Sequence, residues 1–278
     1  MDLSNTFLDA PAIQPKVDVR FDIVAKGTRA SLQTAMRYLI ELPTFSTEKQ
    51  KAVWMWHTSL TTIAWDVSDL ALSASLDSAS LRGARALNRM LLEYAARVHL
   101  YIDDPDLAEI HINEAANMLR RVMKPVAADD SSDPGLAEVR ELMKSGSTKA
   151  KQPSTREMLA AMVATFIPDE SKREPYLEFL DAEYALGNGY VHGSQSSFFD
   201  IFDAKENLLH QRTRVLHRKA EVIRCINCML ALLVGLEKYY AKDFGVAEHL
   251  LALKGLGPYE ALTSIGTHDT LMALLGIQ

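Results

Sequence analysis

Long stretches of this sequence contain neither a helix-breaking residue nor the alternation of polar and apolar residues that marks a strand. The longest stretch with helical periodicity covers residues 204–241. Apolar residues at helical spacing over such a length bury one face of a helix. The sequence also has no internal repeat of the kind that builds solenoids. We therefore predict an all-α protein, a multi-helix bundle of long antiparallel helices with a short C-terminal helical extension.

Changes in composition divide the chain into five segments. Residues 1–26 mix isolated apolar residues with proline, which predicts an irregular N-terminal lead-in. Residues 27–123 are expected to form the first helical half of the bundle, and residues 154–241 the second. Between them, residues 124–153 are rich in Ala, Asp, Ser, Pro and Gly, which predicts a linker or mobile excursion. Short helices are expected over residues 242–278.

Local signals mark two helix boundaries in the first half. A helix is expected from near Thr28 to just before Pro43, because the residue before a proline is pushed out of the helical conformation. Thr47 is followed three residues later by Gln50, which is the pattern of a capping box. The residues after it contain no helix breaker, so a long helix is expected there.

The second half opens with another capping-box pattern, formed by Ser154 and Glu157. A further helix is expected to begin at about Pro175. Further along this segment is the sequence Gly187-Asn188-Gly189, and glycine readily takes the left-handed conformation that ends helices. We therefore expect this helix to end there.

The composition is that of a globular protein, with 48% hydrophobic and 24% charged residues. The net charge of -6 argues against a generally basic, nucleic-acid-coating surface. Two cysteines cannot make a disulfide framework, which favours a reducing compartment. The N-terminal residues lack the pattern of a secretory signal, and the longest apolar run, Met229–Leu236, is shorter than the roughly 18 residues of a membrane span. We therefore expect a soluble, cytoplasmic protein with no membrane contact.

The helix expected over about residues 80–102 carries an unusual charged stripe. Four charged residues recur at steps of four, which advance only about 40° around a helix, and most other positions are apolar. Such a helix belongs in the centre of a bundle, where an unpaired charge costs several kcal/mol. The stripe therefore either forms structural ion pairs or faces a water-filled groove. Its members are Arg85, Arg89, Glu93 and Arg97.

A second stripe follows on the long helix after residue 204, in a locally basic segment. Its members recur at steps of three and four and lie within about 40° of one line. Charged stripes of this kind are usually solvated, so we interpret it first as a solvated helix face. It contains His210, Arg214, His217, Glu221 and Arg224.

Cys225 and Cys228 lie three residues apart on the same helix. A structural zinc site needs four ligands, and this pair has no second pair or capping histidines near it in the sequence. Small buried thiols are common in cores. We therefore expect two core residues, no metal site and no cofactor.

His192 follows the helix that we expect to end at Gly189, within Tyr190-Val191-His192-Gly193-Ser194. We expect it on a loop or at the start of the next helix, where a side chain can meet a ligand. A histidine there could be structural, or it could act as an acid or base near neutral pH.

Two short motifs carry a family resemblance. The first is Arg89-Met-Leu-Leu-Glu93 with its continuation to Pro105, and the second is residues 190–194. They resemble the signatures of an uncharacterised bacterial family catalogued as domain of unknown function 5677, over roughly residues 30–240. That family usually has a serine four residues before its histidine, where this chain has Asn188. The resemblance implies one polar cluster inside a helical bundle, formed by Arg89, Glu93 and His192.

A looser likeness rests on Arg212-Thr-Arg-Val-Leu-His217. An arginine followed after four to six residues by a histidine is similar to the motif of HEPN proteins, a superfamily of helical ribonucleases and nucleotidyl-handling proteins. This likeness implies a second candidate cluster, formed by Arg212, Arg214 and His217.

The first functional hypothesis is a metal-independent ribonuclease or RNA-processing protein of a mobile-element or defence locus. Such cleavage needs a base for the 2′-hydroxyl proton and a fixed cation for the charge on the phosphorane. His192 suits the first role and Arg89 the second, with Glu93 orienting either. The residues expected to bind substrate are Arg85, Arg97, Tyr190 and Ser194.

The alternative is a non-catalytic binding, scaffold or antitoxin-like regulatory module whose polar cluster is structural. The partner is RNA or a nucleotide under the first hypothesis and a protein under the second. The apolar residues 230–236 of the long helix would also suit a homodimer.

Overall fold

The computed structural model describes residues 19–42, 45–76, 81–112, 115, 153–191 and 211–254. These residues are almost all helical and contain no strand, so the predicted all-α class is confirmed. Residues 105–112 are helical after a break at residue 104. The other helices are α1 (Val19–Glu41), α2 (Glu48–Leu76), α3 (Leu81–Asp103), α6 (Thr155–Phe166), the short 3₁₀ helix η1 (Glu170–Lys172), α7 (Arg173–Val191), α9 (Gln211–Tyr240) and α10 (Val246–Lys254).

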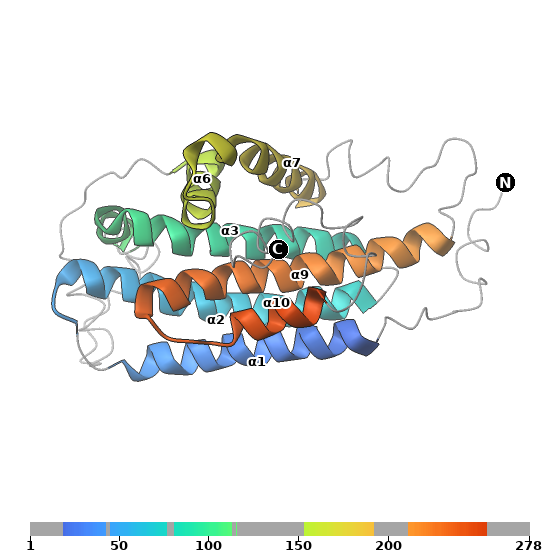
Figure 1. The fold of residues 1–278 in the computed structure, drawn as a ribbon, viewed down its shortest axis with the longest axis horizontal. Coiled ribbons are helices and arrows are strands. Elements are labelled where there is room, and N and C mark those ends of the chain that lie inside the picture. Colours follow the sequence, from blue (N-terminus) through green and yellow to red (C-terminus); the bar gives the residue numbers. More distant parts are fainter. Residues whose placement is uncertain are drawn as a thin grey trace, which may run out of the picture.

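The helices α1, α2, α3 and α9 lie alongside one another and form the body of the bundle (Figure 1). The consecutive pairs α1–α2 and α2–α3 are antiparallel, as predicted. In contrast, α9 runs in the same direction as α3: Asn88 is hydrogen-bonded to Glu221, and His99 lies further along α3 against Ala231. Helices α3 and α9 therefore begin at the same end of the bundle. Helices α6 and α7 lie between them in the chain, in the part that leads back from the end of α3 toward the start of α9.

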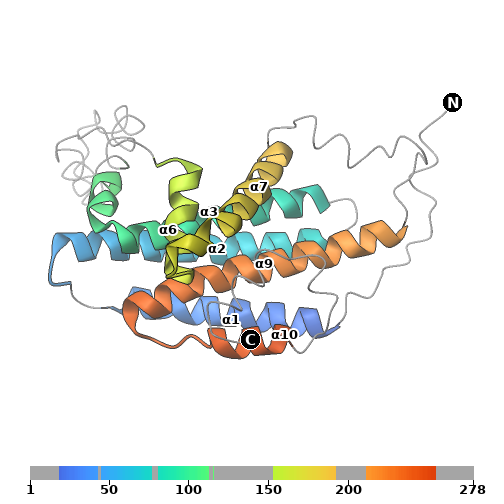
Figure 2. The same cartoon turned by 45° about the horizontal axis from the view of Figure 1, so that its top comes forward.

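Two helices cross α3 on the outside of the bundle. Figures 1 and 2 show α6 and α7 as a connected pair that lies over α3, and α7 continues along the half of α3 that is near its N-terminus. The last described helix, α10, packs beside α1 and also contacts α9. As a result α3 has neighbours on several sides, which confirms its predicted central place.

Both predicted capping boxes start helices. At α2, the backbone N–H of Gln50 donates to Thr47 Oγ1 at 3.2 Å. At α6, the N–H of Glu157 donates to Ser154 Oγ at 3.2 Å, and the N–H of Ser154 donates back to Glu157 Oε2 at 2.6 Å. Each of these bonds satisfies a backbone donor that the first turn of a helix leaves without a partner.

The predicted start of the first helix is wrong. Helix α1 begins at Val19, so the irregular lead-in predicted over residues 1–26 is wrong for residues 19–26. Residues 1–18 lie outside the described part. Thr28 sits inside α1, is fully buried, and donates its hydroxyl to the carbonyl of Val24 at 2.9 Å. Threonine can bond backward within a helix as well as cap one, and the sequence alone does not separate the two uses.

Several predicted segments fall wholly or partly outside the described residues. They include the linker over residues 124–153, apart from Pro153, and residues 204–210 of the long helix, whose described part begins at Gln211. Of the C-terminal extension, the structure describes residues 242–254, and α10 confirms a helix there.

The core is formed mainly by side chains of α3 and α9 that pack against each other and against α1 and α2. Buried side chains of α3 include Leu91, Ala95 and Tyr101, and α9 contributes a continuous buried stretch over residues 225–233. Within the described ranges, none of the helices combines the length and the apolar character needed to cross a membrane.

Candidate functional site

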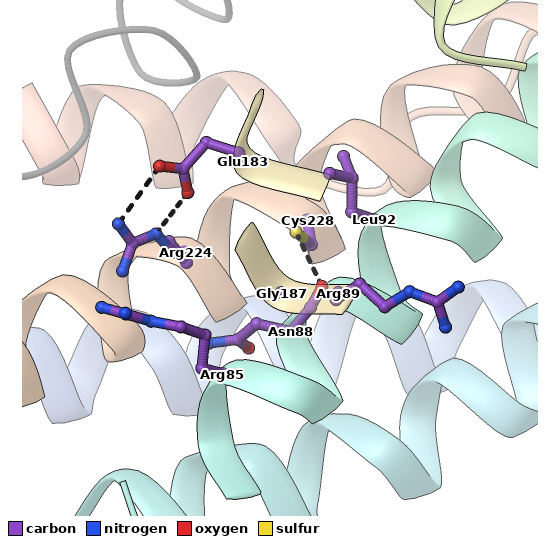
Figure 3. A pocket seen from close by; sticks show the side chains of 8 residues that line it. All are labelled: Arg85, Asn88, Arg89, Leu92, Glu183, Gly187, Arg224 and Cys228. Carbon is purple, nitrogen blue, oxygen red and sulfur yellow. Dashed lines mark hydrogen bonds and ion pairs between the residues drawn. The ribbon is translucent and has the colours of Figure 1, made fainter. Parts of the chain in front are cut away.

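The charged stripe of α3 points toward α7 and α9. Figure 3 shows Arg85 and Asn88 of α3 close to Arg224 and Cys228 of α9, with Glu183 of α7 meeting Arg224. Hydrogen bonds and ion pairs join these and neighbouring side chains into two networks, one around Glu221 and one around Glu93, which we together call the polar cluster. Its members are Arg85, Asn88, Arg89, Glu93, Arg97, Glu183, Tyr184, Glu221 and Arg224.

Glu221 is the most deeply buried ionised group of the polar cluster, with 0% of its side chain exposed. Its Oε1 accepts from Arg85 Nε at 2.8 Å and from Arg224 Nη1 at 2.5 Å. Its Oε2 accepts from the Nδ2 of Asn88 at 3.0 Å. Two guanidinium groups and an amide thus hold a carboxylate that could not otherwise be buried. The interpretation of the second stripe as a solvated face is therefore wrong at Glu221.

Arg224 joins α9 to α7. Its Nε donates to Glu183 Oε2 at 2.7 Å and its Nη2 lies 3.4 Å from Glu183 Oε1. Both side chains are only about a fifth exposed, at 19% and 23%. Because Arg224 also contacts Glu221, it connects the buried interior of the polar cluster with its outer edge.

Glu93 organises the other end of the polar cluster. Its Oε1 accepts from Arg97 Nη2 at 3.0 Å, and its Oε2 lies 3.3 Å from Arg89 Nη2. The hydroxyl of Tyr184 on α7 donates to Glu93 Oε2 at 3.2 Å and accepts from Arg89. The guanidinium of Arg89 also lies over the Tyr184 ring, 4.5 Å from its centre. Of the two alternatives left open for this stripe, ion pairing or a water-filled groove, the structure shows ion pairing of Arg89 with Glu93.

The predicted end of α7 at Gly187-Asn188-Gly189 is wrong, because the helix continues to Val191. Gly187 has a different use: a Cβ atom at this position would lie 2.6 Å from Arg89 Cβ. The glycine thus lets the backbone of α7 approach α3 directly. Tyr190 and Val191 lie in the helix and not on the predicted loop.

A small pocket lies within the polar cluster. Its volume is about 30 Å³, and Figure 3 shows the side chains that line it. Asn88 Oδ1 and Arg89 Nε are buried and have no hydrogen-bond partner within the part of the chain that the structure describes. A pocket of this size has room for about one water molecule, not for a nucleotide. The lining residues are Arg85, Asn88, Arg89, Leu92, Glu183, Gly187, Arg224 and Cys228.

Several predicted site residues cannot be placed against the polar cluster. His192, Ser194 and His210 lie outside the described residues. Tyr190 belongs to α7, while Arg212, Arg214 and His217 belong to the first turns of α9, but their side chains are outside the described part. Of the stripe on α3, the structure joins Arg89 and Arg97 to Glu93, whereas Arg85 pairs with Glu221 of α9.

Cys225 and Cys228 are buried, at 0% and 6% exposed, which confirms them as core residues. Their thiols lie near the carbonyl oxygens of Ser68 and Asn88, at 3.8 Å and 3.7 Å. Burial raises the pKa of the Cys228 thiol to about 12 and that of Cys225 well above its ordinary value. Both thiols are therefore protonated at neutral pH. Across the described ranges, no group of three or more side chains is placed to hold a metal ion.

Sequence reasoning missed the contribution of α7 to the polar cluster. Gly187 lies four residues after Glu183 and three after Tyr184, so it shares a face of that helix with each of them. This spacing is the available signal, but it does not reveal which helix the face meets.

Comparisons of the chain with protein-family models, with curated proteins and with solved structures found no match.

Proposed function

We propose that this chain is a non-catalytic helical module, of a binding, scaffold or antitoxin-like kind, and that its polar cluster is structural. We place it in the cytoplasm, with a protein or a second copy of itself as partner. The observation that carries the proposal is that four guanidinium groups, three of the α3 stripe and one described on α9, are each paired with a carboxylate. These groups belong to Arg85, Arg89, Arg97 and Arg224.

Because these guanidinium groups already bind carboxylates, they are poorly placed to bind the phosphate of a substrate. A cation that stabilises a phosphorane must meet the phosphate oxygens directly. Here the Arg85 and Arg224 guanidinium groups meet at the buried carboxylate of Glu221, and Glu93 lies between Arg89 and Arg97. Buried ion pairs of this kind can fix how helices meet, because displacing one partner leaves the other charge unpaired. The polar cluster is suited to holding α7 in one register on α3 and α9.

Replacing Glu93 by alanine tests the structural role. Glu93→Ala removes the acceptor shared by Arg89, Arg97 and Tyr184, so it should lower the free energy of unfolding by about 3 kcal/mol. Urea denaturation followed by circular dichroism measures this loss. The exposed Glu174, paired with Arg156, supplies the control: Glu174→Gln should change stability by about 0.5 kcal/mol or less. Equal stability of the two variants contradicts a structural role.

A second candidate function is metal-independent RNA cleavage. The observation that favours it is Arg89 Nε, a buried donor without a partner among the described residues. His192 would take the 2′-hydroxyl proton, Arg89 would stabilise the phosphorane and Glu93 would orient either group. The likeness of residues 89–105 and 190–194 to domain of unknown function 5677 implies that Arg89, Glu93 and His192 lie in one cluster, as this candidate requires. The HEPN-like spacing supports a variant of it with Arg212, Arg214 and His217.

RNA cleavage separates the two candidates. The purified protein is incubated with total RNA in the presence of a chelator, beside His192→Ala and His217→Ala variants. The binding module predicts no cleavage by any of them. Cleavage by the wild type that is lost in His192→Ala supports the first catalytic constellation, and loss in His217→Ala supports the second. Equal cleavage by all three points to a contaminating nuclease and removes both catalytic assignments.

A further inference from the structure

A groove lies between α6 and the end of α3, and its lining residues all differ from those of the polar cluster. Its volume is about 560 Å³, and its apolar lining includes Leu100 of α3 and Leu107 of the helical segment that follows. Helix α6 contributes Ala160, Ala161 and Ala164, which lie on one side of that helix. Alanine side chains end at Cβ, so this side of α6 leaves open the space that longer side chains would fill in a close-packed interior.

The charged residues that line the groove are mainly acidic. They are Asp103, Asp104 and Glu157, with Arg173 as the one basic residue among the described lining. The guanidinium of Arg173 donates to two backbone carbonyl groups of the segment between α6 and η1, at 2.7 Å and 2.9 Å. Arg173 is thus held against the backbone and does not neutralise the carboxylates of the groove.

Asp103 stands in an unfavourable place. It is the last residue of α3, and the last turn of that helix contains no basic residue. The C-terminal end of a helix carries partial negative charge, which disfavours a carboxylate and favours a cation. The neighbouring Asp104 has a structural use, because its Oδ1 accepts from the backbone N–H of Leu107 at 3.1 Å. Within the described ranges Asp103 makes no hydrogen bond or ion pair, so its charge is open to an incoming cation.

We propose that this groove binds a basic amphipathic helix of a partner protein. The inference rests on the proposed function, because it names the partner of a binding module. Apolar residues of the docked helix would contact the alanine and leucine lining, and lysine or arginine residues beside them would meet the carboxylates. The groove side of α6 extends from Glu157 to Ala164, about 10 Å at 1.5 Å per residue, which matches two turns of a docked helix.

A second copy of the chain suits this groove less well. A symmetric dimer formed through the groove would place the same patch of each copy against the other. Asp103 and Asp104 of the two copies would then meet, and like charges brought together in an interface are unfavourable. A partner that supplies positive charge avoids this repulsion.

Fluorescence anisotropy of a labelled peptide, measured with the full chain, tests the groove. The probe is a peptide of about 14 residues, roughly four helical turns, with leucine on one face and lysine on the other. One control peptide has glutamate in place of lysine, and another has the composition of the probe with its leucines scattered around the helix. We expect the probe to bind at least about tenfold more tightly than either control. Equal binding of the probe and either control, or no binding of the probe, overturns the proposal.

Substitutions then locate the bound peptide. Ala164→Trp fills the groove and should weaken binding of the probe by about tenfold or more. Asp103→Asn combined with Asp104→Asn should weaken it about fivefold, and asparagine at residue 104 can still cap the next helix. The control, Asp66→Asn with Asp69→Asn on α2, removes the same number of charges outside the groove and should leave the affinity unchanged. Equal affinities of the two double variants overturn the proposal, and this comparison decides if Ala164→Trp does not fold. Unchanged affinity of a folded Ala164→Trp variant overturns it as well.

Sedimentation of the chain without peptide tests the other occupant. A dimer that disappears in Ala164→Trp would show that a second copy fills the groove, which overturns the proposal. The RNA assay judges the proposed function separately. Cleavage that is lost in His192→Ala refutes the proposed function even if the probe binds. Failure of the probe to bind a chain that does not cleave RNA refutes the groove alone.

Discussion

Gly187 of α7 lies directly against Arg89 of α3. A Cβ atom added at Gly187 would be 2.6 Å from Arg89 Cβ and 3.0 Å from Arg89 Cγ. The backbones of the two helices therefore come close enough for Tyr184, one turn earlier on α7, to reach both Arg89 and Glu93. The glycine and the polar contacts depend on the same close approach.

Replacing Gly187 by alanine should separate α7 from α3. The added methyl group must displace either the α7 backbone or the stem of Arg89, so we expect the free energy of unfolding to fall by about 2 kcal/mol. Gly83 of α3 is the control, because a Cβ there meets nothing within 4 Å. Gly83→Ala should be neutral or stabilising by up to about 1 kcal/mol, through better helix propensity. Urea denaturation of both variants checks the expectation, and equal effects contradict it.

Replacing Glu221 by glutamine should destabilise the protein about as strongly as Glu93→Ala. Two guanidinium groups, of Arg85 and Arg224, then face a neutral amide in a fully buried position. Breaking a buried ion pair from one side typically costs about 3–5 kcal/mol, and we expect about 3 here because Arg224 retains Glu183. The thermal unfolding midpoint and the urea midpoint measure this loss. A change as small as that of the exposed Glu174→Gln would contradict the assignment of Glu221 as the centre of the cluster.

Removing the Tyr184 hydroxyl should weaken the attachment of α7 without abolishing it. Tyr184→Phe keeps the ring under the Arg89 guanidinium but removes the bonds to Arg89 and Glu93, at a cost of about 1–2 kcal/mol. Tyr184→Leu removes the ring as well and should cost more. Hydrogen exchange of the α7 amides reports the change locally. We expect the α7 amides to exchange faster in the variants while the α2 amides are unaffected. Unaltered exchange in α7 would count against this contact.

The sequence predicted the helices well where local chemistry decides their ends. Thr47 and Ser154 cap helices because their hydroxyls accept from backbone N–H groups three residues onward, which is a property of neighbouring residues alone. Pro43 likewise follows a helix that ends at Glu41. These signals need no knowledge of the tertiary structure.

The sequence predicted less where one residue type serves two purposes. Gly187 was expected to close a helix, and it admits a neighbouring helix instead. Glu221 was expected in a solvated stripe, yet one of its partners, Arg85, lies 136 residues away in the chain. A solvated stripe and a stripe buried against opposite charges have the same helical spacing. Only the packing of α3 against α9 distinguishes them.

Buried histidines should make the stability of the protein fall in mild acid. Burial lowers the pKa of His99 to about 4 and that of His57 to about 3, from 6.5. The unfolded chain therefore takes up protons below about pH 6.5 that the folded protein does not bind. The stabilising effect of these neutral rings is complete above pH 6.5 and is lost as the pH falls toward 4, by about 1.4 kcal/mol per pH unit for each histidine.

A His99→Gln variant isolates one of these contributions. His99 Nε2 lies 2.9 Å from the carbonyl of Ala231, and a glutamine amide can donate to the same oxygen without titrating. Urea denaturation at pH 7, 6 and 5 should show a shallower dependence for His99→Gln than for the wild type, by about 1.4 kcal/mol per unit between pH 6 and 5. His57 remains to give a residual slope in the variant. Identical slopes for the two proteins would mean that His99 takes up its proton in the folded state as readily as in the unfolded chain.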